Sequence, residues 1–173
     1  MIIDNYPMNE DIYEKKYFMK EHLVLAVPSG HHSNQEAKQW KLTAEDIQNN
    51  VHTKKEIQGV PLKLFADEPF VMLRAHNDTR ERVEAICKRA EINPKVALKL
   101  NQLMTVYHLT EKGMGNAILS DTVVKCMPPS PGIVYYKIDD PSAERNVYFY
   151  YRKNKYFTKS MDEFIKVAIS DQR

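Results

Sequence analysis

Residues 69–120 read PFVMLRAHNDTRERVEAICKRAEINPKVALKLNQLMTVYHLTEKGMGNAILS and alternate short apolar runs with longer amphipathic ones. A short apolar run bounded by turn residues is typical of a buried strand, whereas apolar residues spaced three and four apart indicate a helix. Strands that alternate with helices favour right-handed crossovers and a largely parallel sheet covered on both faces. The pattern therefore predicts an α/β fold, with strands at 69–73, 95–100 and 116–120 and helices at 79–90 and 101–112.

The first of these helices has a defined start, end and apolar stripe. Asp78 is expected to be its N-cap, because Glu81 three residues later completes a capping-box pattern. Asn93 and Pro94 are expected to end it. Cys87 falls on the apolar stripe of this helix, so we expect its side chain to be part of the core. The stripe consists of Val83, Ile86, Cys87 and Ala90.

The chain before residue 69 contains one further strand and a polar stretch. The run HLVLAVP, His22–Pro28, is apolar and ends in proline, which predicts a buried strand. Residues 29–59 have few large apolar side chains and are expected to form a surface excursion. Within it, Thr43 and Asp46 resemble a cap on a short helix from Ala44 to Asn50.

The last third of the chain is rich in aromatic residues. We expect aromatic strands from Ile133 and from Arg145, and a final helix with Ser160 as its cap and Glu163 at the box position. The alternation of Tyr148–Tyr151 with basic neighbours would also suit a stacking platform for single-stranded nucleic acid. A buried strand is the preferred interpretation, since aromatic residues favour strands.

Composition sets limits on the class of protein. A chain of 173 residues accommodates one domain or one two-lobed unit. Its 25 basic and 23 acidic side chains are scattered, so the charge gives no nucleic-acid footprint. No apolar run approaches the roughly 18 residues of a membrane span, and residues 1–16 lack the features of a signal peptide. Two cysteines fit a reducing compartment, so we expect a cytoplasmic protein without membrane partners.

Polar side chains follow two strands of the predicted sheet. In an open α/β sheet, ligands bind where the carboxyl ends of strands meet helix N-termini. The turn Arg74–Thr79 occupies such a place and its donors favour an anion, while Asp78 uses its carboxylate on the helix itself. The alternative is an ordinary capped turn with solvent-facing polar groups. The candidate binding residues are His76, Asn77, Asp78 and Thr79 on the first turn, and Asn101, Gln102 and Thr105 on the second.

Other motifs give no catalytic, cofactor or metal site. Gly113 and Gly115 do not form a dinucleotide fingerprint, because Ile118 replaces the third glycine and a helix precedes them; helix termination and close packing explain them instead. His31 and His32 are adjacent and are expected in a loop. Nucleophile-elbow, zinc-protease and phosphate-loop motifs are absent from the sequence. We therefore expect no enzyme, no cofactor and no metal site.

The order of the motifs resembles the C-terminal effector-binding (substrate-binding) domain of LysR-type transcriptional regulators over almost the whole chain. The resemblance implies the fold of type 2 periplasmic binding proteins, in which two α/β lobes are joined by two strands that cross near Val27 and Tyr150. It assigns residues 28–147 to lobe II and leaves lobe I incomplete. It also implies an N-terminally truncated chain that lacks the DNA-binding helix-turn-helix. The motifs are HLVLAVP at 22–28, the stretch from DEPFVML to AILSDT at 67–122 and RNVYFYYRKNKYFTKSMDEFIKV at 145–167; the remnants of lobe I are residues 1–26 and 148–173.

The resemblance also implies a function and partners. It implies a bacterial sensor that binds a small metabolite, an organic anion, in the cleft between the lobes, with the seven candidate residues facing that cleft. It places the helix from Thr79 to Ala90 at the dimer interface of the full-length protein, and DNA would be bound only through the missing N-terminal domain. Two alternatives stay open: a solute-binding protein of a transport system with the same fold, and an α/β enzyme that uses the same cleft.

Overall fold

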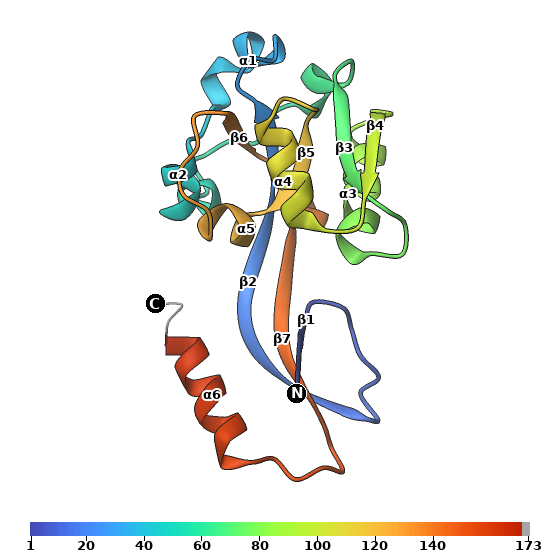
Figure 1. Ribbon diagram of the computed structural model, residues 1–173, viewed down its shortest axis with the longest axis vertical. Helices are drawn as coiled ribbons and strands as arrows, with labels where there is room; N and C mark the ends of the chain where they lie inside the picture. The colour runs from blue at the N-terminus through green and yellow to red at the C-terminus, as the bar shows by residue number, and fades with distance from the viewer. Residues whose placement is uncertain (171–173) are drawn as a thin grey trace. The chain divides into compact units, whose positions relative to one another are not determined.

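The computed structural model describes residues 1–170, which form two compact units. One unit consists of Met1–Glu21 together with the chain from Arg145 onward, and the other of His22–Glu144. The chain passes from one unit to the other twice, after Glu21 and after Glu144, and Figure 1 traces both passages. The lobe boundaries expected from the sequence, near residues 26–28 and 147–148, lie a few residues after these two points of passage.

The larger unit contains a mixed sheet whose order is β4, β3, β5, β2, β6. Strands β3 and β4 are parallel, and β3 joins β5 through a parallel bridge between Phe70 and Asn116. Strand β2 pairs antiparallel with both β5 and β6. The prediction of a largely parallel sheet is therefore correct for four strands and wrong for β2, which runs the opposite way. The strands are β2 (Tyr13–Pro28), β3 (Pro69–Leu73), β4 (Lys95–Leu100), β5 (Ala117–Ser120) and β6 (Ile133–Lys137).

Helices cover both faces of this sheet, as the sequence predicted. Side chains alternate across a strand, so Leu25 and Val27 of β2 enter one core with helix α3, while Val24 and Ala26 enter the other with α2, α4 and α5. Cys87 lies in the α3 core, where burial raises the pKa of its thiol to about 11, and the expectation of a core cysteine is confirmed. The helices are α1 (Ser33–Glu36), α2 (Ala44–Gln48), α3 (Asp78–Arg89), α4 (Leu103–Glu111) and α5 (Asp121–Lys125), with 3₁₀ turns η1 (Lys38–Trp40), η2 (Val51–Thr53), η3 (Leu62–Phe65) and η4 (Pro141–Ala143).

The stretch from Ser29 to Gly59 is more than a surface excursion. Its predicted short helix is confirmed, since Thr43 and Asp46 form a complete capping box at the start of α2. However, Leu42 and Ile47 are buried in the core shared with α4 and α5, and His52 is only 2% exposed. Sequence reasoning underestimated this segment because its apolar residues are widely spaced and its η2 turn has no distinctive pattern.

Two helices begin earlier than predicted. The N-cap of α3 is Asn77, whose backbone is extended and whose side-chain oxygen accepts a hydrogen bond from the N–H of Thr79 at 2.9 Å. Asp78 is already helical, and its carboxylate pairs with Arg82 at 2.8 Å. In the final helix, Thr158 accepts from the N–H of Met161 in the role predicted for Ser160. Several neighbouring polar residues can cap a helix, so the sequence alone located each start only approximately.

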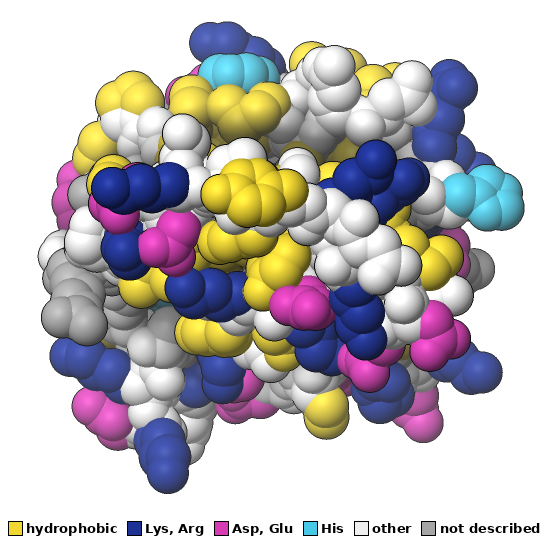
Figure 2. Space-filling model, turned by 90° about the horizontal axis from the view of Figure 1, so that it is seen from below, with side chains coloured by type: hydrophobic (Ala, Val, Ile, Leu, Met, Phe, Trp, Pro, Cys, Tyr) yellow, Lys and Arg dark blue, Asp and Glu magenta, His cyan; other side chains and the backbone are white. Residues whose placement is uncertain are grey.

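The smaller unit combines strands β1 (Ile2–Asp4) and β7 (Glu144–Arg152), the first part of β2, and helix α6 (Lys159–Ser170). The ring of Phe149 lies 4.6 Å from that of Phe18 and also contacts Phe164. The buried guanidinium of Arg145 donates to Glu21 at 2.6 Å. This unit exposes Ile2, Ile3, Tyr17, Phe164 and Val167. Figure 2 shows hydrophobic side chains at the surface among Lys and Arg side chains.

Within residues 1–170, the helices are too short or too polar to cross a membrane.

The loop before β5 depends on a glycine. Gly115 has a φ of +149°, and a Cβ there would lie 2.7 Å from the carbonyl oxygen of Pro69 in β3. The same backbone region joins the two strands, because the N–H of Asn116 donates to that oxygen at 2.8 Å. Close packing, one of the two roles expected for the glycine pair, is therefore confirmed at Gly115.

We predict that Gly115→Ala lowers the free energy of unfolding by about 1–3 kcal/mol, because the added methyl group meets backbone that cannot move without separating β3 from β5. Urea denaturation would measure the loss. The matched control is Gly30→Ala, since nothing lies within 4 Å of a Cβ at Gly30. Equal stability of the two variants would contradict the prediction.

Candidate functional site

Two polar turns lie side by side at the carboxyl edge of the sheet. Leu73 and Leu100, the last residues of β3 and β4, are register partners. The N–H of Arg74 donates to the carbonyl of Leu100 at 2.8 Å, which ties the start of one turn to the start of the other. The two groups of candidate residues chosen from the sequence therefore follow adjacent strands.

The first turn presents some of its candidate residues and buries another. His76 has a φ of +65° and is exposed, as are Arg74 and Asn77. Asn77 and Asp78 are partly occupied by the helix, through the N–H of Thr79 and the side chain of Arg82. Thr79 is only 7% exposed and packs into the interior. The groups available to a ligand are thus the side chains of Arg74 and His76 and the part of the Asn77 side chain that does not cap α3.

The second turn is exposed throughout. Asn101, Gln102 and Thr105 all face solvent, and the hydroxyl of Thr105 lies 3.5 Å from the side-chain oxygen of Gln102. Gln102 precedes α4 without capping it through its side chain. The cavity between α3 and α4 measures only about 10 Å³, which leaves room for at most about one water molecule. A ligand held by these turns would therefore bind on the exposed edge, outside this cavity.

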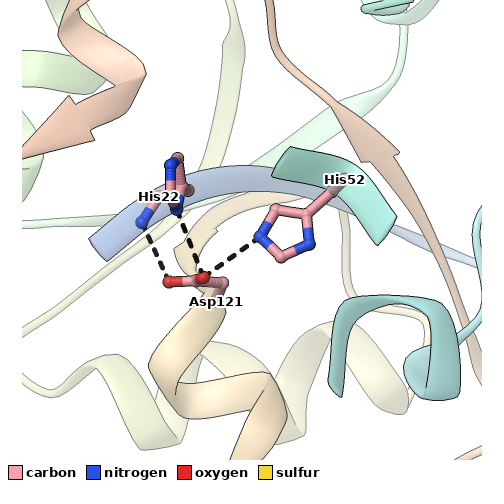
Figure 3. A group of neighbouring side chains, drawn as sticks. All are labelled: His22, His52 and Asp121. Atoms are coloured by element: carbon pink, nitrogen blue, oxygen red, sulfur yellow. Dashed lines mark hydrogen bonds and ion pairs between the residues drawn. The ribbon is translucent and has the colours of Figure 1, made fainter. Parts of the chain in front are cut away.

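A third polar group at the same edge was missed by sequence reasoning. Figure 3 shows His22, His52 and Asp121, which come from β2, η2 and the start of α5. Asp121 follows the carboxyl end of β5, and His22 reaches this edge because β2 runs antiparallel to β5. His52 is brought in by the segment between α2 and β3. These residues are far apart in the sequence, and only the position of Asp121 at a strand end gave a signal.

The carboxylate of Asp121 is fully buried and accepts several hydrogen bonds. Its Oδ1 accepts from the backbone N–H of His22 at 2.9 Å. Its Oδ2 lies 3.0 Å from Nε2 of His52, 2.7 Å from Nζ of Lys125 and 3.5 Å from Nδ1 of His22. Burial alone would raise the pKa of Asp121, but the contacts with His22, His52 and Lys125 lower it more, and the net shift is well below the usual value. The carboxylate is therefore ionised at neutral pH.

A cavity of about 380 Å³ opens beside this cluster. It lies within the larger unit, where β2 and β6 meet the loop before η4. Its polar lining includes His22, His52, Lys137, Asp139, Asp140 and Glu144.

A separate polar network involves the loop histidines. Nδ1 of His31 lies 3.1 Å from the carboxylate of Glu68 and 3.0 Å from the side-chain oxygen of Asn116. Asn116 precedes β5, so this network lies at the edge opposite the two turns. His32 points into solvent with 87% of its side chain exposed. The prediction that both histidines lie in a loop is confirmed, with His32 directly before α1.

Comparisons with known proteins indicate one family. The family model described as LysR substrate binding domain matches residues 1–172. The curated relative YcgK of Bacillus subtilis (strain 168), an uncharacterized HTH-type transcriptional regulator, is 23% identical over 166 residues. The match covers 94% of this chain but 48% of that protein, so the chain spans about half of its relative's length.

Solved structures agree on the fold. The regulatory domain of Synechocystis PCC6803 CcmR in complex with 2-PG superposes with a TM-score of 0.71 at 18% identity, covering 99% of this chain and 72% of that one. The effector-binding domain of QuiR in complex with shikimate gives a TM-score of 0.65 at 18% identity, covering 98% and 69%. The effector-binding domain of BenM with benzoate gives 0.64 at 17% identity, with the same coverage. The predicted fold of type 2 periplasmic binding proteins is confirmed.

We predict that Asn77→Ala lowers the free energy of unfolding by about 1 kcal/mol, because it leaves the N–H of Thr79 without its cap. The matched variant Asp78→Ala removes a part-buried pair with Arg82 within the same helix and is expected to cost less, roughly 0.3–0.5 kcal/mol. Urea denaturation of both variants distinguishes the two residues. A larger loss for Asp78→Ala would mean that Asp78 is the cap after all.

Proposed function

Because the chain belongs to the LysR substrate-binding domain family, we propose that it is the effector-sensing region of a LysR-type bacterial transcriptional regulator. It binds a small metabolite, and this binding shifts an equilibrium between states of the whole regulator that hold DNA differently. The observation that carries the proposal is the family match over residues 1–172, combined with the adjacent polar turns at the carboxyl ends of β3 and β4. No catalytic step is part of this function.

The turns favour an organic anion as the effector. Arg74 and His76 are exposed donors beside the N-terminus of the 12-residue helix α3, whose dipole favours negative charge. Asn101, Gln102 and Thr105 add neutral polar groups from the neighbouring turn. Shikimate and benzoate, which occupy the effector domains of QuiR and BenM, are carboxylates. We therefore assign the effector contacts to His76 and Asn77 on the first turn and to Asn101, Gln102 and Thr105 on the second. Asp78, which pairs with Arg82, and Thr79, which is buried, support the first turn instead of contacting the effector.

The whole protein would act in the cytoplasm as a homo-oligomer on DNA. In this proposal residues 1–26 and 148–173 belong to lobe I, residues 28–147 form lobe II, and an N-terminal helix-turn-helix outside this chain contacts the DNA. Helix α3 carries Glu81, Glu84, Lys88 and Arg89 on its exposed face, and this face forms part of the contact between subunits.

The proposal is tested with the native polypeptide, including whatever precedes Met1. A panel of small carboxylates that contains shikimate and benzoate is titrated by calorimetry, and operator binding is followed in parallel. For the carboxylate that binds, we predict that His76→Ala and Asn101→Ala each weaken affinity by roughly 10-fold or more, as expected when a hydrogen bond to a charged ligand worth about 1.5–3 kcal/mol is lost.

The control for these variants is His32→Ala, because His32 is an exposed histidine of the same unit away from the two turns. Unchanged affinity in both site variants would refute the assignment of the turns. A native polypeptide that has no DNA-binding segment and binds no DNA would refute the regulatory function itself.

We further predict that charge reversal on the exposed face of α3, in the double variant Glu84→Lys and Lys88→Glu, weakens self-association of the native protein by at least about 10-fold. Sedimentation velocity over a range of concentrations measures the change. Glu45→Lys on α2 is the control, since Glu45 is also exposed but lies on another helix. The same sedimentation profile for all three proteins would exclude α3 from the subunit contact.

A further inference from the structure

The cluster of His22, His52 and Asp121 has the donor set of a metal site. Two imidazoles and one carboxylate offer one ligand atom each, and these atoms lie within 4.8 Å of one another. In a tetrahedral site with metal–ligand bonds of about 2.0–2.1 Å, neighbouring ligand atoms are roughly 3.3–3.4 Å apart. Oδ2 of Asp121 lies 3.0 Å from Nε2 of His52 and 3.5 Å from Nδ1 of His22, so small side-chain movements would bring all three around one ion.

We propose that His22, His52 and Asp121 form a binding site for a divalent transition-metal ion, with Zn²⁺ and Co²⁺ as its typical occupants. Nitrogen-rich donor sets favour these ions, whereas Mg²⁺ and Ca²⁺ require mainly oxygen ligands. The proposal concerns the chain itself and does not depend on its being a transcriptional regulator. This proposal differs from the expectation drawn from the sequence, which was that the chain has no metal site.

One buried nitrogen of the cluster supports the proposal. Nδ1 of His22 is buried and has no hydrogen-bond partner among the described residues, although Oδ2 of Asp121 is its near neighbour. An unsatisfied buried polar atom costs roughly 1–3 kcal/mol, and such atoms in native proteins point to an absent ion or water. An ion between Nδ1 and Oδ2 would bind both. The edge-on packing of the two imidazoles, with ring centres 5.5 Å apart, leaves their nitrogens free to converge on Asp121.

The carboxylate is already oriented for this role. The backbone N–H of His22 holds Oδ1, so Oδ2 is the oxygen that faces the two imidazoles. Lys125 would compete with a metal ion for Asp121. Its ammonium group donates to Oδ2 at 2.7 Å and supplies the positive charge that a metal ion would bring. The side chain of Lys125 is 30% exposed and only its far end would have to move. Metal binding therefore displaces an ammonium group from a fixed carboxylate.

An ion can reach the cluster from the adjoining cavity. His22 and His52 both line the cavity of about 380 Å³, and the carboxylates of Asp139, Asp140 and Glu144 line it as well. Each of these carboxylates has a basic neighbour, since Asp140 pairs with Arg89, Asp139 lies 3.5 Å from Lys137 and Glu144 lies 4.0 Å from Nε2 of His22. With three protein ligands, the remaining coordination positions stay open to water or to a small ligand in the cavity.

The test measures Zn²⁺ binding by competition with a chromophoric chelator and Co²⁺ binding by its visible absorption, using the native protein in chelator-treated buffer. We expect one Zn²⁺ per chain in this competition and a tetrahedral Co²⁺ spectrum, with no displacement by millimolar Mg²⁺. His22→Gln and His52→Gln should each lose more affinity than the roughly 10- to 100-fold caused by removing an outer-shell partner. His32→Gln, at a fully separate and exposed histidine, should bind as the unchanged protein does.

Lys125→Gln provides the decisive variant, because removing the competing ammonium should increase Zn²⁺ affinity by about 10-fold or more, which a misfolded protein would not do. Far-UV circular dichroism of each variant shows whether it is folded. No Zn²⁺ binding by the unchanged protein would overturn the proposal. So would equal affinities of folded His22→Gln and His32→Gln, or a loss of affinity in folded Lys125→Gln.

Discussion

The burial of strand β2 between β5 and β6 is the constraint on which the rest of the larger unit depends. Residues Val24–Val27 have no exposed surface, because strands flank them on both edges and helices cover both faces. Each buried Val or Leu side chain stabilises the fold by roughly 1.5–3 kcal/mol. Since alternate side chains enter opposite cores, this one strand joins the packing around α3 to the packing around α2, α4 and α5.

The direction of β2 also determines where the candidate binding residues lie. Strands β3, β4, β5 and β6 end at one edge, and β2 enters the unit at that same edge with His22. The exposed turns after Leu73 and Leu100 and the buried cluster around Asp121 therefore occupy a single edge of the sheet. They differ in physical character. The turns offer donors to solvent, whereas Asp121 is a buried charge that must be compensated by His22, His52 and Lys125, since an uncompensated buried charge would be very unfavourable.

These two features support different conclusions. Membership of the LysR substrate-binding domain family accounts for the fold, and the exposed turns are the effector contacts that we propose. The register of β2 against β5 and the position of η2 bring the histidine pair onto a buried carboxylate. A metal ion at this cluster would connect β2, η2 and α5 next to one of the two places where the chain passes between units.

The sequence by itself determined the local elements. The bounds of β3 and β4 are those that the apolar runs predicted, and Thr43 with Asp46 capped α2 as expected, because these features depend on residues close together in the chain. The sequence also placed the polar turns at strand ends. Only the tertiary structure decided that β2 is antiparallel, that Thr79 is buried and that His22, His52 and Asp121 meet. Those outcomes depend on strand order and packing between distant segments, which local periodicity and capping patterns do not contain.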